Sequence, residues 1–122
     1  MVITPREFEE LVEQALGELP KRFADLLENI AIVVEEEPTD EDLDALGDDA
    51  EEDDELLGIY RGVALTERSF DMLPRLPDQV AIFRGPILRI ARNRHEAVRE
   101  IRETVIHELG HYFGLHDDEM EF

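Results

Sequence analysis

One short motif constrains this chain more than any other feature: His107-Glu108-Leu109-Gly110-His111, late in a strongly periodic apolar segment. In a helix, residues four apart lie on one face, so His107 and His111 can direct both imidazoles at a single metal ion. Glu108 lies one position further round, where it would reach a metal-bound water instead of the metal. The chain contains no cysteine, so a metal site must be built from histidine and carboxylate ligands.

The segment around the motif is expected to form a helix from about Arg94 to Phe113. Asn93 is a candidate N-cap, and Glu96 is its partner in a capping box. The side that packs on the core is formed by apolar residues at spacings of three and four, namely Val98, Ile101, Val105, Leu109 and Tyr112. His107 and His111 lie off this stripe, as a pair of ligands facing a cleft requires.

The third metal ligand must lie upstream or within a short tail, because the chain ends only eleven residues after His111. Gly114 can end the helix in a left-handed turn that directs the chain back towards the histidines. In the extended pattern HExxHxxGxxH the third ligand follows the second histidine by six residues, which is the position of Asp117. His116 is its rival, since imidazole is the softer ligand. The remaining candidates in the tail are Asp118, Glu119 and Glu121.

The preceding sequence predicts a single domain over residues 1–122 that mixes helices and strands. Helices are expected over 5–19 and 21–29, the first with a capping box formed by Thr4 and Glu7 around Pro5. Strands are expected at three places, 30–34, 56–65 and 79–83, and the first of them should be buried because it is a continuous β-branched run. Gly58 and Gly62 mark bulges or close approaches. Pro86 is expected to open a further short helix that runs to Ile90.

Acidic residues dominate the composition and give a formal net charge of −20. Residues 39–55 are expected to form a mobile acidic loop with no more than one helical turn. Such a charge repels nucleic acid and anionic membranes, so neither is an expected partner, whereas basic peptides would be attracted. No apolar run approaches the ~18–20 residues needed to cross a bilayer, and the N-terminal residues lack a signal pattern. A cytoplasmic location is the expectation.

Three stretches together resemble the small bacterial zincin-like metallopeptidase family: residues 107–118, 57–68 and 84–87. The resemblance implies a minimal zincin fold of the α+β class. In that fold a small, mostly three-stranded sheet packs against N-terminal helices and a C-terminal metal-binding helix. It also implies a zinc site formed by His107, His111 and Asp117, with Glu108 as the general base.

The expected function is therefore zinc-dependent cleavage of a peptide or protein substrate, with a basic one favoured by the acidic surface. A metal-activated water would attack the scissile carbonyl, and Glu108 would carry its proton to the leaving amine. The strand 79–83 is a candidate sheet edge for aligning an extended peptide, and Tyr60, Tyr112 and Arg84 are candidates to assist the oxyanion. The alternative is a non-catalytic zinc-binding module, structural or regulatory, in which His116 closes a four-ligand sphere.

Overall fold

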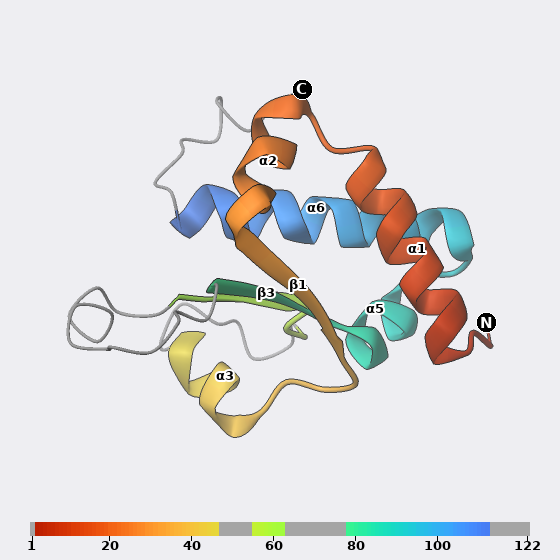
Figure 1. Ribbon diagram of the computed structural model, residues 1–122. Helices are drawn as coiled ribbons and strands as arrows, with labels where there is room; N and C mark the ends of the chain where they lie inside the picture. Colours follow the sequence, from red (N-terminus) through yellow and green to blue (C-terminus); the bar gives the residue numbers. More distant parts are fainter. Residues whose placement is uncertain (1, 47–54, 63–77, 113–122) are drawn as a thin grey trace.

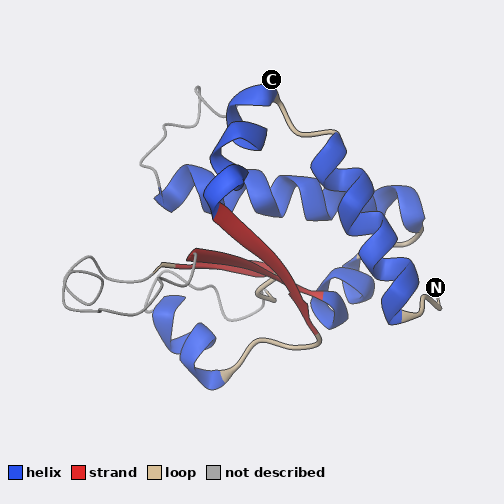
Figure 2. Cartoon of the chain, in the orientation of Figure 1, coloured by secondary structure: helices blue, strands red, loops and turns tan. Residues whose placement is uncertain are grey.

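The computed structural model describes residues 2–46, 55–62 and 78–112, which form an α+β fold of the expected class. Helices α1, α2 and α6 lie over one face of a small sheet, and α3 lies on the other side (Figure 1). The helices are α1 Pro5–Gly17, α2 Lys21–Leu26, α3 Asp40–Leu46, α5 Arg84–Ile90 and α6 Arg94–Tyr112, with a 3-10 turn at Leu27–Asn29. The strands are β1 Ile30–Glu35, β2 Gly58–Arg61 and β3 Asp78–Phe83, drawn in red in Figure 2.

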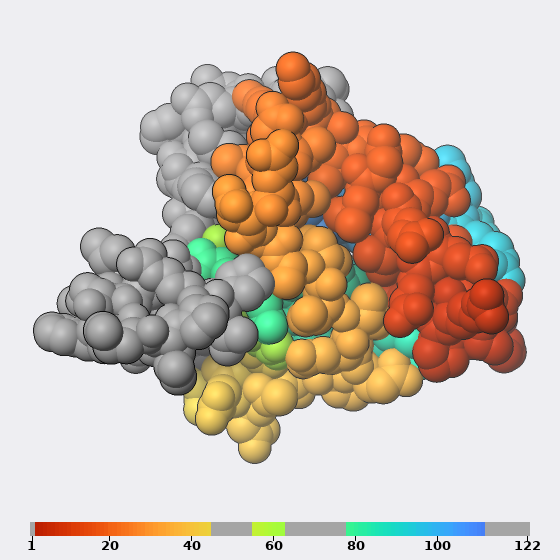
Figure 3. All heavy atoms as spheres, in the orientation of Figure 1, coloured from red at the N-terminus to blue at the C-terminus, as the bar shows by residue number. Residues whose placement is uncertain are grey.

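The sheet has the order β1-β3-β2, with β1 parallel and β2 antiparallel to β3. The central strand is thus β3, whose residues Val80 to Phe83 are completely buried. The expectation that 30–34 forms a buried strand is wrong in one respect, because β1 lies at the edge of the sheet that the described strands form, and all six of its residues are half-buried. The segment that contains β1 is visible at the front surface between α1 and α3 (Figure 3). A β-branched run predicts a strand, but it does not determine how many neighbours the strand has.

Alternation along the strands divides the core into a large and a small part. Val80 and Ile82 point towards the helices and pack in the main core, whereas Ala81 and Phe83 join Ile59 in a small cluster on the opposite face. The helices fill the main core with completely or almost completely buried side chains, among them Phe8, Phe23, Ile87, Ile101, Val105 and Leu109. The apolar stripe predicted for α6 is therefore confirmed from Val98 to Leu109.

Helix α1 packs along α6, and both begin at the predicted caps. Thr4 and Glu7 form the complete capping box. On α6 the Asn93 side chain accepts from the Glu96 N–H at 2.9 Å, but the Glu96 carboxylate turns to the Arg92 N–H and not to Asn93. Across the described ranges no helix is both long and apolar enough to span a bilayer.

The expectation of an acidic loop over 39–55 is wrong for its first part, which is the helix α3. Thr39 and Asp42 form a reciprocal capping box, in which the Asp42 N–H donates to Thr39 Oγ1 at 3.1 Å and the Thr39 N–H donates to Asp42 Oδ2 at 2.9 Å. Acidic residues in a first turn are also stabilised by the helix dipole. Residues 47–54 lie outside the described part of the chain.

Candidate metal centre

The two histidines of the motif lie side by side on the open face of α6. Both side chains are exposed, their ring centroids are 4.1 Å apart and their planes are tilted by 48°. Two nitrogens bound to one tetrahedral zinc ion lie about 3.3 Å apart, a spacing that neighbouring rings of this kind can provide. Val105 and Leu109 anchor the opposite side of the helix in the core. The donor set of His107 and His111 therefore fits half of a zinc site.

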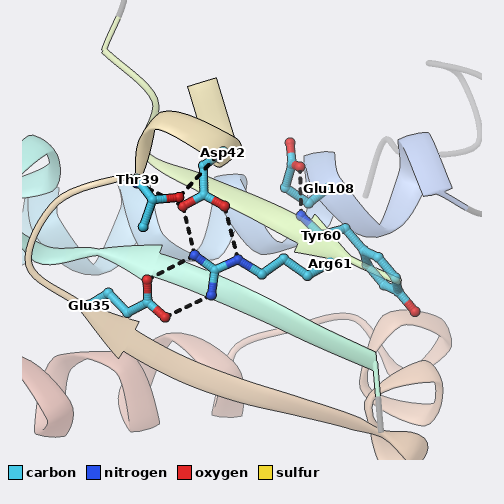
Figure 4. Close-up of polar contacts among 6 residues, drawn as sticks. All are labelled: Glu35, Thr39, Asp42, Tyr60, Arg61 and Glu108. Carbon is cyan, nitrogen blue, oxygen red and sulfur yellow. Dashed lines mark hydrogen bonds and ion pairs between the residues drawn. The ribbon is translucent and has the colours of Figure 1, made fainter. Parts of the chain in front are cut away.

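Glu108 lies beside this pair, half-buried where α6 meets the sheet. Its Oε1 accepts a hydrogen bond from the backbone N–H of Tyr60 on β2 at 3.1 Å (Figure 4). Burial raises the pKa of Glu108 above the usual range of a glutamate, and the Tyr60 N–H and the neighbouring histidines oppose that rise. Because a general base works best with a pKa nearer the working pH, this environment suits a carboxylate that moves protons.

The contact with Tyr60 depends on how closely β2 approaches α6 at Gly58. A Cβ at Gly58 would lie 2.6 Å from Thr104 Cγ2 and 2.7 Å from the Ala81 carbonyl oxygen, so only glycine fits between the helix and the central strand. Two residues of strand and four residues of helix both rise by about 6 Å. Gly58 therefore meets Thr104 and Tyr60 meets Glu108 in the same register. The sequence marks Gly58 as either a bulge or a close approach, and the structure confirms the close approach.

Replacing Gly58 with alanine is expected to lower the free energy of unfolding by about 1–3 kcal/mol, because the added methyl group forces β2 away from α6 or from β3. Urea denaturation followed by circular dichroism measures the change. Gly17→Ala is the matched control: a Cβ there meets no atom within 4 Å, so that variant should be as stable as the parent or slightly more stable. Equal stability of the Gly58 and Gly17 variants would contradict the close approach.

Several residues suggested by the sequence are not placed at the histidines. The Arg84 guanidinium donates to Glu36 at 2.8 Å and to the Ile3 carbonyl, which ties it to the N-terminal segment. The Tyr60 hydroxyl donates to Asp78 Oδ2 at 2.7 Å. The expectation that 79–83 forms a sheet edge is wrong, because β3 has a partner strand on each side.

The predicted third ligands lie outside the described residues. This holds for Asp117, for its rival His116 and for Asp118, Glu119 and Glu121, and the side chain of Tyr112 is also not described. Within the ranges that are described, no three histidine or acidic side chains are grouped closely enough to hold a metal ion. The described part of the site consequently comprises His107, Glu108 and His111.

A second polar group, which the sequence did not reveal, adjoins the site on β2. The Arg61 guanidinium donates two hydrogen bonds to Glu35 at 2.7 and 2.8 Å and two to Asp42 at 3.0 and 2.7 Å (Figure 4). These bonds lower the pKa of both carboxyls and raise that of the arginine. In the sequence this group is marked only by a single arginine followed by glycine in a predicted strand, and that pattern predicts no particular partner for the arginine.

Comparisons with known proteins address the family and the fold of the chain. The model of a protein family described as zincin-like metallopeptidase matches residues 27–122. No curated protein matches the chain. Among solved structures, a conserved hypothetical protein from Thermo thermophilus is similar in fold, with a TM-score of 0.52 and 24% sequence identity. The similarity covers 91% of this chain and 94% of that one.

Proposed function

Because the chain belongs to the zincin-like metallopeptidase family, we propose that it is a zinc-dependent peptidase. The observation that carries the proposal is the exposed pair His107 and His111 with the half-buried Glu108 next to it on the same helix. An exposed histidine pair alone could be a surface feature. The carboxylate held by the edge of the sheet beside that pair is what a hydrolytic site requires in addition.

The proposed metal ligands are His107, His111 and a third group from the C-terminal tail. Asp117 is preferred by its register in the motif, and His116 is the rival. When bound, zinc would supply a Lewis acid that acidifies a coordinated water and polarises the substrate carbonyl. An open position for that water distinguishes a catalytic site from a closed structural one.

Glu108 is proposed to act as the general base and then as the acid. Within the described part of the chain only its Oε1 has a hydrogen-bond partner, the Tyr60 N–H, which leaves Oε2 to take a proton from the attacking water. The same carboxyl can then donate that proton to the leaving amine. Because Tyr60 holds one oxygen, the carboxylate does not have to be reoriented for each transfer.

The substrate is proposed to be an extended peptide aligned along β2. Among the strands that the structure describes, only β3 pairs with β2, and the other edge of β2 faces Glu108 through the Tyr60 N–H. Backbone pairing with an edge strand is a common way to hold an extended peptide. Because the Tyr60 N–H is bound to Glu108, this pairing would use the other backbone groups on that edge. The net charge of −20 favours basic peptides through long-range attraction. This preference should weaken as the salt concentration rises.

Removal of the metal tests the proposal. Protein purified with zinc is expected to contain about one zinc per chain by mass spectrometry and to cleave an unstructured basic peptide. Cleavage should cease after dialysis against 1,10-phenanthroline and return when one equivalent of zinc is added. Stoichiometric zinc with no cleavage of basic or acidic peptides would instead favour the non-catalytic module. In that case removing the metal should lower the melting temperature without any change in turnover.

A further inference from the structure

The Arg61 side chain is anchored on the face of the sheet that points away from α6, although Arg61 directly follows the residue that holds Glu108. Tyr60 packs with the main core beside α6, whereas its neighbour Ile59 lies in the small cluster on the opposite face. Successive residues of a strand alternate, so Arg61 shares that opposite face. Resting on the proposed function, we propose that Arg61 is a positioning residue, which fixes β2 so that the Tyr60 N–H holds the Glu108 carboxylate.

The first support is the number and quality of the bonds that Arg61 makes. All four are charge-assisted and lie between 2.7 and 3.0 Å, with Glu35 and Asp42 each bound in a bidentate manner (Figure 4). Such pairs fix orientation as well as distance. The Asp42 side chain is only 6% exposed, and Thr39 holds it from the other side through the capping box. Arg61 is thus bound to a group that cannot easily follow it if β2 moves.

The second support is the span of the arginine. On β3, Arg61 lies opposite Gln79, while Glu35 on β1 lies opposite Phe83. These two positions are four residues apart, about 13 Å along the strand. The arginine side chain therefore runs diagonally across the central strand and ties the two edges of the sheet together. Its guanidinium passes over the Phe83 ring with the carbon 6.0 Å from the ring centroid. The tether resists sliding of β2 along β3.

The third support is that the described part of the chain offers β2 few other restraints on its register. The strand comprises four residues, and among the described strands it pairs with β3 alone. Sliding by one residue would exchange the faces of its side chains and carry the Tyr60 N–H away from Glu108. A displacement of about 1 Å would already break a hydrogen bond of 3.1 Å. Gly58 fixes the start of the strand against Thr104, and Arg61 fixes its end.

Amide hydrogen exchange of the zinc-loaded protein, followed residue by residue by NMR, tests the proposal. In Arg61→Gln the protection of the Tyr60 amide is expected to fall by about tenfold or more, while Val80 and Ile82 in β3 keep theirs. Arg61→Lys should show an intermediate loss, since an ammonium cannot bind two carboxylates in a bidentate manner. If the Arg61→Gln variant does not fold, the Arg61→Lys variant provides the test instead. Arg94→Gln is the matched control, because it removes an ion pair with Glu7 far from β2.

A double-mutant cycle separates positioning from general stabilisation. Glu108→Ala removes the acceptor, so the Tyr60 amide should lose protection in that variant as well. Adding Arg61→Gln to it should then change the Tyr60 exchange by less than about twofold. Additive losses in the double variant, or a uniform loss over Tyr60, Val80 and Ile82 in the single one, would show that Arg61 only stabilises the fold and would overturn the proposal.

Peptide cleavage provides an independent readout. If Arg61 acts through the position of Glu108, Arg61→Gln should lower kcat by about tenfold, with a smaller rise in KM because the peptide is proposed to pair along β2. An increase in KM alone would assign the arginine to substrate binding and contradict the proposal. Hydrogen exchange needs no turnover. A wild-type protein without peptidase activity would therefore contradict the proposed function, and the exchange data would still decide whether Arg61 holds the contact between Tyr60 and Glu108.

Discussion

Replacing Glu108 with glutamine is expected to lower kcat/KM for peptide cleavage by about 10³-fold, with the zinc content unchanged at about one per chain. Glutamine has nearly the same shape and can still accept the Tyr60 N–H through its amide oxygen, so the fold and the histidine pair are preserved. It cannot take a proton from water at neutral pH. The loss should therefore appear in kcat, and the metal content from mass spectrometry should equal that of the parent protein.

Glu103→Gln provides the matched control for this experiment. Glu103 lies on the same helix, is exposed to solvent and undergoes the same change of charge. The control should retain turnover within about twofold, apart from a small effect on the attraction of basic peptides. Equal activity of the Glu103 and Glu108 variants would contradict a base at position 108. If neither variant nor the parent cleaves peptides while zinc remains bound, the non-catalytic module is the better description.

Replacing His111 with alanine is expected to weaken zinc binding by about three orders of magnitude, because a bound zinc ion is worth ~10–16 kcal/mol shared among three or four ligands. Competition with a chromophoric chelator at pH 7 measures the affinity. Turnover should be lost together with the metal. Since the side chain of His111 is exposed, the stability of the metal-free variant should equal that of the metal-free parent.

His95 offers the control for the histidine experiment, because it is an exposed histidine in the first turn of the same helix. His95→Ala should leave the zinc affinity within about twofold of the parent value. A loss of zinc affinity in the His95 variant would place the metal near the N-terminal end of α6, away from His107 and His111, and would contradict the proposed site. Unchanged affinity in the His111 variant would remove the histidine pair from the proposed site.

The part of the site that could be predicted from the sequence is the part set by local geometry. His107, Glu108 and His111 are close in sequence, and a helix of known period fixes their relative directions. The hydrogen-bond donor to Glu108 could not be predicted from local geometry. It is the backbone N–H of Tyr60, which is 48 residues away in the sequence, and a backbone group has no side-chain signature. Arg61 is 26 residues from Glu35 and 19 from Asp42, in a chain with far more acids than bases. Composition alone could not choose its partners.

The fold shows the same division between local and long-range information. Caps and periodicity predicted α1 and α6, since both signals lie within a few residues of each other. The order of the strands depends on pairing between distant segments, so the sequence alone wrongly predicts an edge position for β3 and a buried one for β1. Helix α3 is longer than the single helical turn that its sequence predicts on the ground that a dense run of like charges favours a mobile chain. The Thr39 cap and the arginine that binds Asp42 outweigh that repulsion.

The packing of α1 on α6 has a consequence for where a working fragment of this protein can begin. The family match starts at residue 27, and a polypeptide cut at that boundary would retain every candidate ligand and the whole sheet. It would lose α1, whose buried residues Phe8, Leu11, Val12 and Ala15 belong to the same core as Ile101, Val105 and Leu109. The helix that presents the histidines would then expose its apolar side to water. The region of family similarity, residues 27–122, is therefore shorter than the part of the chain that supports the site, which also includes α1.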